Sequence, residues 1–249
     1  MPSLLDMRRR IKSVKNTQQI TKAMKMVAAA KLKRAQDRVT AARPFALKMN
    51  EVLANLSANV GDFSHPLLDE RGDENYLIVM ISADKGLCGG FNTNLMKTAQ
   101  TFMKENSAKQ FEMIPVGRKG RDFFKRRNIT IIEEYVGLTG AGRIDYSEVQ
   151  EIARGVIKTF TEDEKIDKVF IVFSEFKSVM SQNPVVEQLL PVPRNLETTD
   201  EKDKAQAEYL YEQPSAEIFG RLLPKQVETQ IYRAILESIA SEQGARMTA

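Results

Sequence analysis

The chain has 249 residues, enough for one large domain or two unequal ones, and 42% of them are hydrophobic. Its single cysteine excludes an internal disulfide framework, and with only one histidine a Cys/His metal cluster is excluded as well. The net charge of +4 conceals an asymmetry, since residues 1–48 hold 13 Lys and Arg against two acids and the remainder holds 24 basic and 31 acidic groups. This distribution predicts that the N-terminal part meets an acidic partner.

No targeting segment is evident. The longest apolar runs fall short of the roughly 18–20 residues that a membrane-spanning helix needs. The N-terminal stretch MPSLLDMRRR lacks the apolar core and cleavage site of a secretory signal, so we expect an intracellular chain.

Residues from about 3 to 58 are predicted to form one long helix. Alternate steps of three and four give sixteen positions, thirteen of them apolar, which is typical of a coiled-coil seam. Such a helix would be roughly 80 Å long, so most of it should project beyond any compact domain. The seam positions are Leu4, Met7, Ile11, Val14, Gln18, Thr21, Lys25, Ala28, Leu32, Ala35, Val39, Ala42, Ala46, Met49, Leu53 and Leu56.

The middle of the chain alternates strands with helices. This alternation predicts an α/β fold whose five-stranded sheet is mostly parallel. The last strand contains prolines and is therefore expected at an edge of the sheet. The predicted strands are 76–82, 111–117, 129–136, 168–176 and 185–193, and the predicted helices are 93–105, 118–128 and 147–160.

A second helical region begins at about residue 215 and continues to the end. Its seam becomes small toward the C-terminus, which favours close antiparallel packing on the alanine-rich part of the first helix. The seam residues are Val227, Ile231, Ala234, Ser238, Ser241, Ala245 and Thr248. The alanines of KMVAAAK are then expected to face this helix and the lysines to face outward. The predicted units are a helix at 1–60, an α/β domain at 75–193, a charged insertion at 194–213 and a helix at 214–249.

No residue in the sequence is a strong candidate for catalysis. The Gly-rich segment DKGLCGGFN follows a predicted strand, but it matches neither the P-loop nor the dinucleotide fingerprint, so a structural turn is the favoured interpretation. Cys88 has no second cysteine or free histidine to activate it. His65 lies in a predicted connection, where a polar structural role is favoured over catalysis. We therefore predict no catalytic residue, no cofactor site and no metal site.

The basic first helix leaves three kinds of acidic partner to compare. Nucleic-acid binding would favour aromatic residues among the cations, but Phe45 is the only aromatic in residues 1–48. Membrane-surface binding needs a free, bulky apolar face, whereas this face is committed to a seam. Acidic protein loops fit best. A basic coiled-coil protein that binds nucleic acid remains the alternative function, and an α/β enzyme using the Gly-rich turn is a second.

Three segments carry a resemblance to a known family. RRRIKSVKNTQQITKAMKMVAAAKLKRAQ, SADKGLCGGFN and LLPKQVETQIYRAILESIASEQGARMTA occur in the order found in the gamma subunit of the F-type proton-translocating ATP synthase, which the chain closely resembles. The resemblance covers nearly the whole chain. It implies an antiparallel coiled coil of the two terminal helices with a Rossmann-like α/β domain at its foot.

The resemblance implies a mechanical, non-catalytic role. Members of the family form the central stalk that rotates inside a ring of three alpha and three beta subunits and couples proton flow to ATP synthesis or, in reverse, hydrolysis. The implied partners are the alpha and beta subunits, the epsilon subunit and the c-subunit ring, with an inhibitory protein as a further candidate and no nucleic acid. A bacterial form is implied, peripheral to the cytoplasmic face of the cell inner membrane.

The resemblance also carries over a set of interaction residues. In the family, the basic face around KAMKMV meets acidic loops of the beta subunits. In the family the last helix continues several turns beyond ARMTA, so we expect the upper part of the shaft to be missing here. The residues implied to take part in coupling are Lys22, Met24, Lys25, Glu242, Gln243 and Arg246.

Overall fold

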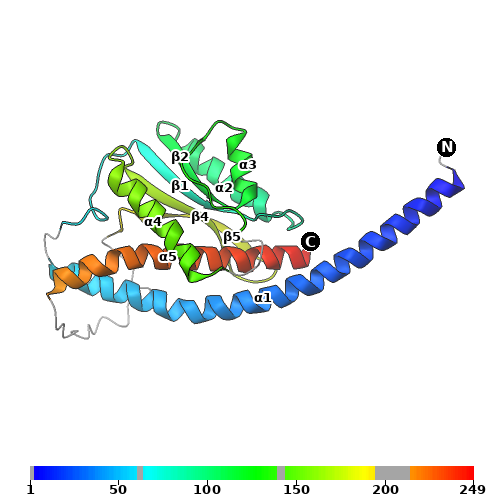
Figure 1. The fold of residues 1–249 in the computed structure, drawn as a ribbon, viewed down its shortest axis with the longest axis horizontal. Helices are drawn as coiled ribbons and strands as arrows, with labels where there is room; N and C mark the ends of the chain where they lie inside the picture. The colour runs from blue at the N-terminus through cyan, green and yellow to red at the C-terminus, as the bar shows by residue number, and fades with distance from the viewer. Residues whose placement is uncertain (1–2, 61–63, 139–143, 194–213) are drawn as a thin grey trace.

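The computed structural model describes residues 3–60, 64–138, 144–193 and 214–249 (Figure 1). The predicted charged insertion at 194–213 lies outside the described residues. In the part of the chain that is described, no helix combines the length and apolar character needed to cross a membrane.

Two helices from opposite ends of the chain lie side by side. Helix α1 spans Leu4–Val60 and helix α5 spans Ser215–Thr248. Figure 1 shows α5 running antiparallel to the C-terminal half of α1, as predicted. Pro44 and Pro224 lie inside these helices without ending them.

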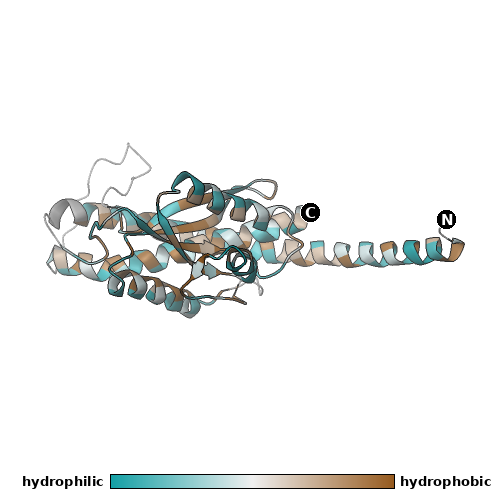
Figure 2. Ribbon diagram, turned by 90° about the horizontal axis from the view of Figure 1, so that it is seen from above, coloured by the Kyte–Doolittle hydropathy of each residue, from teal (hydrophilic) through white to brown (hydrophobic). Residues whose placement is uncertain are grey.

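The seam predicted on α1 is buried only in its second half. Thr21 and Lys25 are exposed, and so are the apolar positions before them, among which Leu4 is 80% exposed. Figure 2 shows this N-terminal half extending away from the rest of the molecule. The buried seam residues are Ala28, Leu32, Ala35, Val39, Ala46, Met49, Leu53 and Leu56.

The α/β domain is built on a five-stranded sheet with the order β3-β2-β1-β4-β5. β1, β2, β3 and β4 pair in parallel, and β5 pairs antiparallel to β4 at the edge. The predicted fold class is therefore confirmed. The elements are β1 (Asn75–Ile81), α2 (Phe91–Glu105), β2 (Gln110–Val116), α3 (Arg118–Lys125), β3 (Thr130–Ile131), α4 (Tyr146–Glu162), β4 (Lys168–Phe176) and β5 (Gln182–Leu190).

β3 is much shorter than the predicted strand 129–136. Only Thr130 and Ile131 pair with β2, and a single further bridge joins Tyr135 to Val116. The apolar residues in this segment are at most half-buried, because β3 lies at an edge of the sheet. Apolar content alone therefore overestimated the strand.

Alternate residues of β1 point into two separate apolar layers. Leu77, Val79 and Ile81 pack in the layer that includes α4, α5 and the buried half of α1. Ile78 and Met80 pack in the layer that includes α2 and α3. Both faces of the central strand are thus covered, which explains its continuous apolar run.

Helix α5 lies between α1 and the sheet. Residues 234–245 are all buried, including five polar or charged ones and Gly244. This part of α5 has no face toward solvent, because it contacts α1 on one side and the sheet on the other. The apolar seam predicted from the sequence accounted for only one of these two interfaces. Ser238 and Ser241, predicted to face α1, instead bind the backbone of β4.

Candidate functional site

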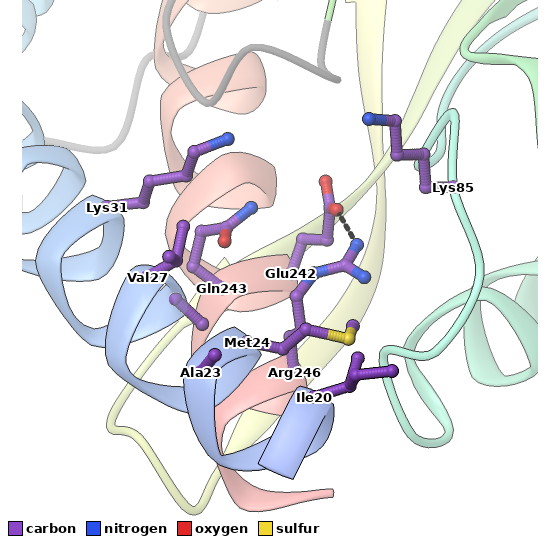
Figure 3. Close-up of a pocket in the computed structure, with 10 residues that line it drawn as sticks. Ile20, Ala23, Met24, Val27, Lys31, Lys85, Glu242, Gln243 and Arg246 are labelled. Carbon is purple, nitrogen blue, oxygen red and sulfur yellow. Dashed lines mark hydrogen bonds and ion pairs between the residues drawn. The ribbon is translucent and has the colours of Figure 1, made fainter. Parts of the chain in front are cut away.

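A groove of about 380 Å³ lies where α1 crosses the C-terminal turns of α5 and the loop after β1. Figure 3 shows side chains from all three elements around it. Apart from Lys31, the residues that α1 contributes to the groove are apolar, and those from α5 and the loop are polar or charged. The groove is lined by Ile20, Ala23, Met24, Val27, Ala28, Lys31, Lys85, Glu242, Gln243 and Arg246.

The structure brings together four of the six residues implied by the family resemblance. Met24 of α1 lies across the groove from Glu242, Gln243 and Arg246 of α5 (Figure 3). The other two, Lys22 and Lys25, are exposed on α1 and do not line the groove. The helical period explains this, since neighbours of Met24 point to other faces of the helix.

Two further cations line the groove and were not predicted. Lys31 lies two helical turns beyond Met24 on α1, and Lys85 follows β1 in the Gly-rich turn. The helical spacing could have indicated Lys31. Lys85 required knowledge that α5 ends against this turn, which no local pattern contains.

Glu242 and Arg246 form a buried ion pair one helical turn apart on α5. Burial raises the pKa of Glu242, and the guanidinium of Arg246 opposes this rise. Arg246 Nη1 also donates to the carbonyl oxygen of Gly86 at 2.6 Å and to that of Leu87 at 3.4 Å. Because Arg246 binds both its own helix and the turn, it fixes the end of α5 on the domain.

The Gly-rich turn is a platform for the end of α5. Gly89 has a φ of +54°, a conformation that favours glycine, and a Cβ there would lie 3.6 Å from the carbonyl oxygen of Ala245. Asn92 stabilises the start of this turn, because its Oδ1 accepts a hydrogen bond from the amide of Ala83 at 3.1 Å. Asp84 accepts from the amides of Arg118 and Gly137 at 3.0 and 2.8 Å. Gly89 is therefore favoured by the backbone conformation of the turn.

Cys88 and His65, the two residues considered for nucleophilic chemistry, lie in surroundings that favour a structural role. Cys88 is 2% exposed, and burial raises the pKa of its thiol, which disfavours the reactive thiolate. His65 Nδ1 accepts from the amide of Leu67 at 3.2 Å, and burial lowers the pKa of its imidazole against the opposing charge of Asp69. Among the described residues, no group of three or more His, Cys, Asp or Glu is arranged to hold a metal ion.

Comparisons with known proteins agree on one family. A family model described as ATP synthase matches residues 3–249. The ATP synthase gamma chain of Desulforamulus reducens is 52% identical over 252 residues, which cover all of this chain and 85% of that relative. The chain belongs to the ATP synthase gamma family. The gamma chain of Solibacter usitatus is 48% identical with the same coverage.

Solved structures of this family share the architecture. The central stalk and c-ring structure of the mitochondrial ATP synthase from Tetrahymena thermophila contains a chain that is 26% identical, with a TM-score of 0.66. The match covers 92% of this chain and 96% of that one. A rotor chain of the Euglena gracilis enzyme, 20% identical with a TM-score of 0.60, shares the fold.

Proposed function

We propose that the chain is the central-stalk rotor of an F-type ATP synthase. In this role it couples proton flow through the membrane sector to conformational changes at catalytic sites on the alpha and beta subunits, for ATP synthesis or for hydrolysis in reverse. The chain itself is non-catalytic and holds no cofactor. Residues 1–60 and 214–249 form the shaft, and residues 75–193 form the foot domain.

The observation that carries this proposal is the projecting half of α1. From Leu4 to about Val27 the helix is almost entirely exposed, and it carries seven cations on a shaft that extends past the domain. An asymmetric basic shaft suits the centre of a ring of acidic loops, because individually weak exposed ion pairs guide without locking. The cations are Arg8, Arg9, Arg10, Lys12, Lys15, Lys22 and Lys25.

We assign the coupling contact to the groove and to the basic face beside it. Met24, Glu242, Gln243 and Arg246 would present a shaped surface to the beta subunits, while Lys22 and Lys25 attract their acidic loops. The foot would bind the epsilon subunit and the c-subunit ring, with an inhibitory protein as a further partner. In this arrangement the chain would lie peripherally at the cytoplasmic face of the inner membrane.

The proposal is tested by reconstitution with alpha and beta subunits. We expect a defined complex with one copy of this chain and stimulated magnesium-dependent ATP hydrolysis. The variant Lys22→Gln/Lys25→Gln should weaken assembly by up to about fivefold at low salt, since each exposed pair contributes about 0.5 kcal/mol. Lys97→Gln/Lys104→Gln removes two exposed cations from α2 and should assemble normally.

Two outcomes would change the proposed function or its contact residues. Absence of any complex with the wild-type chain, together with tight and salt-sensitive binding to DNA or RNA, would favour the nucleic-acid alternative. Equal assembly of both double variants would leave the rotor role standing but remove Lys22 and Lys25 from the contact.

A further inference from the structure

β4 extends further than its neighbour β1. Pairing with β1 stops at Val172, whereas β4 continues to Phe176. On that side, the last residues of β4 therefore have backbone groups with no strand to pair with. In open α/β sheets, this crevice at the carboxyl ends of the strands is where ligands usually bind.

Helix α5 fills this crevice with three polar side chains. The amide of Ser174 donates to Ser238 Oγ at 3.1 Å, and Ser241 Oγ donates to the carbonyl oxygen of Ser174 at 3.0 Å. The amide of Phe176 donates to Glu237 Oε2 at 2.9 Å. The side chains of the helix thus take the place of the missing strand.

Glu237 also binds the other helix of the shaft. Its Oε1 accepts from Arg43 Nη2 of α1 at 3.0 Å. The Glu237 side chain is 5% exposed and that of Arg43 is 51% exposed. One buried carboxylate therefore connects α1, α5 and β4.

These polar contacts fix a position that apolar packing alone would leave variable. Apolar contact is non-directional, so it specifies the relative position of two packed surfaces less sharply than paired polar groups do. Buried charged and hydrogen-bonded groups have fixed partners, and setting the register between packed elements is their best-attested use. Here the register in question is that of the shaft on the α/β domain.

We propose that Glu237, with Arg43, Ser238 and Ser241, forms a shaft joint that makes the two-helix shaft and the α/β domain turn as one body. The inference rests on the proposed rotor function. Torque that enters at the foot domain reaches the shaft through this joint. Glu237 is a positioning residue, since it contacts no reacting group.

The test uses the complete ATP synthase containing this chain, in sealed vesicles. ATP hydrolysis and ATP-driven proton pumping are measured together, against an increasing opposing proton gradient. Glu237→Gln, which removes the charge that holds Arg43, and Ser238→Ala/Ser241→Ala should hydrolyse ATP as the wild type does. Both should lose pumping at opposing gradients against which the wild type still pumps.

Two further variants separate the joint from general damage. Arg43→Lys keeps the charge opposite Glu237 and should pump against higher gradients than Arg43→Gln. Gln226→Met alters another buried residue of α5, whose amide donates to Asn50 of α1 at 2.6 Å and not to the sheet. It should match the wild type in pumping under load.

The results distinguish this inference from the function on which it rests. If assembled Glu237→Gln and Ser238→Ala/Ser241→Ala complexes pump against the same gradient as the wild type, the joint is wrong and the rotor function stands. If Gln226→Met loses pumping equally, the loss is explained by general weakening of the shaft and not by the joint. If wild-type complexes hydrolyse ATP but never pump, the proposed rotor function itself fails.

Discussion

At the scale of single residues, Asp73 gathers a cluster at the amino end of the sheet. Its Oδ1 accepts from Tyr76 and from Lys168 at 2.6 Å each, and its Oδ2 accepts from Lys109 at 2.8 Å. Hydrogen bonds from the two lysines and from Tyr76 hold the pKa of Asp73 well below its ordinary value near 3.8. Burial and the same carboxylate raise the pKa of Tyr76 to about 12.

This cluster predicts an acid-dependent contribution to stability. Because the folded-state pKa of Asp73 is depressed, the contribution is complete well above pH 3.8 and declines as the pH falls toward the folded-state value. We expect Asp73→Asn to lower the melting temperature at pH 7 slightly, since the side chain is 53% exposed and screened by solvent. The difference from wild type should shrink toward about pH 2.

Thermal unfolding followed by circular dichroism between pH 7 and pH 2 measures this difference. Glu162→Gln is the control, because Glu162 makes only a 3.9 Å contact with Lys158 and both side chains are more than two-thirds exposed. Its melting temperature should follow that of the wild type at every pH. A melting-temperature deficit for Asp73→Asn that stays constant down to pH 2 would contradict the assignment.

Part of the groove could be predicted from the sequence, and the rest could not for a physical reason. Glu242, Gln243 and Arg246 were carried over from the family and do meet Met24 across the groove. The contacts of Arg246 with the turn, and the position of Lys85 in the groove, depend on tertiary packing of segments about 160 residues apart. Glu237 was not singled out at all, because a carboxylate in a helical run looks like any surface residue until both neighbours are known.

At the scale of elements, α5 shows where periodicity is informative and where it is not. The apolar run of β1 and the alternation of strands and helices were sufficient to predict the sheet. In α5, burial on both sides erases the contrast between faces, so its serines were assigned to the wrong neighbour. In α1, a seam that is apolar at most of its positions has a partner in only one half of the described helix.

The alanine-rich turn of α1 predicts an asymmetric response to larger side chains. Ala28 is fully buried at the groove, whereas Ala29 and Ala30 are exposed, so only one of the three predicted contacts with α5 is made. Ala28→Leu should destabilise the protein by about 1–3 kcal/mol, because an added side chain must displace α5. Ala29→Leu should change stability by less than about 0.5 kcal/mol.

Urea unfolding monitored by circular dichroism compares the two variants, since both substitutions keep good helix-forming residues and differ only in the face they change. A lower unfolding midpoint for Ala28→Leu alone supports close packing of α1 on α5 at this turn. Equal midpoints for the two variants would show that the helices separate there in solution.

At the scale of the whole molecule, packing divides α1 into an exposed half and a packed half. The basic N-terminal half is exposed, and its apolar positions are covered by nothing in the described residues. The second half is packed against α5 and the domain. If the chain occupies the centre of an alpha and beta ring, as proposed, the ring supplies the cover that the first half lacks.

This division predicts a pattern of limited proteolysis. An unsupported helical segment frays readily, because most helical stability in proteins comes from tertiary packing. Trypsin should therefore cut the isolated chain among the cations from Arg8 to Lys25 before it cuts the exposed sites Lys97 and Lys104 on α2. In the complex with alpha and beta subunits, the same segment should resist cleavage.

Mass spectrometry of fragments over time, for the free chain and for the assembled complex, follows both regions in one digestion. The cleavage sites on α2 serve as an internal control, since assembly around the projecting helix should leave their rate nearly unchanged. Equal cleavage of residues 8–25 in the free and assembled states would mean that the ring does not enclose this half of α1. The cover for its apolar positions would then have to come from another partner, and the proposed placement of the shaft would be wrong.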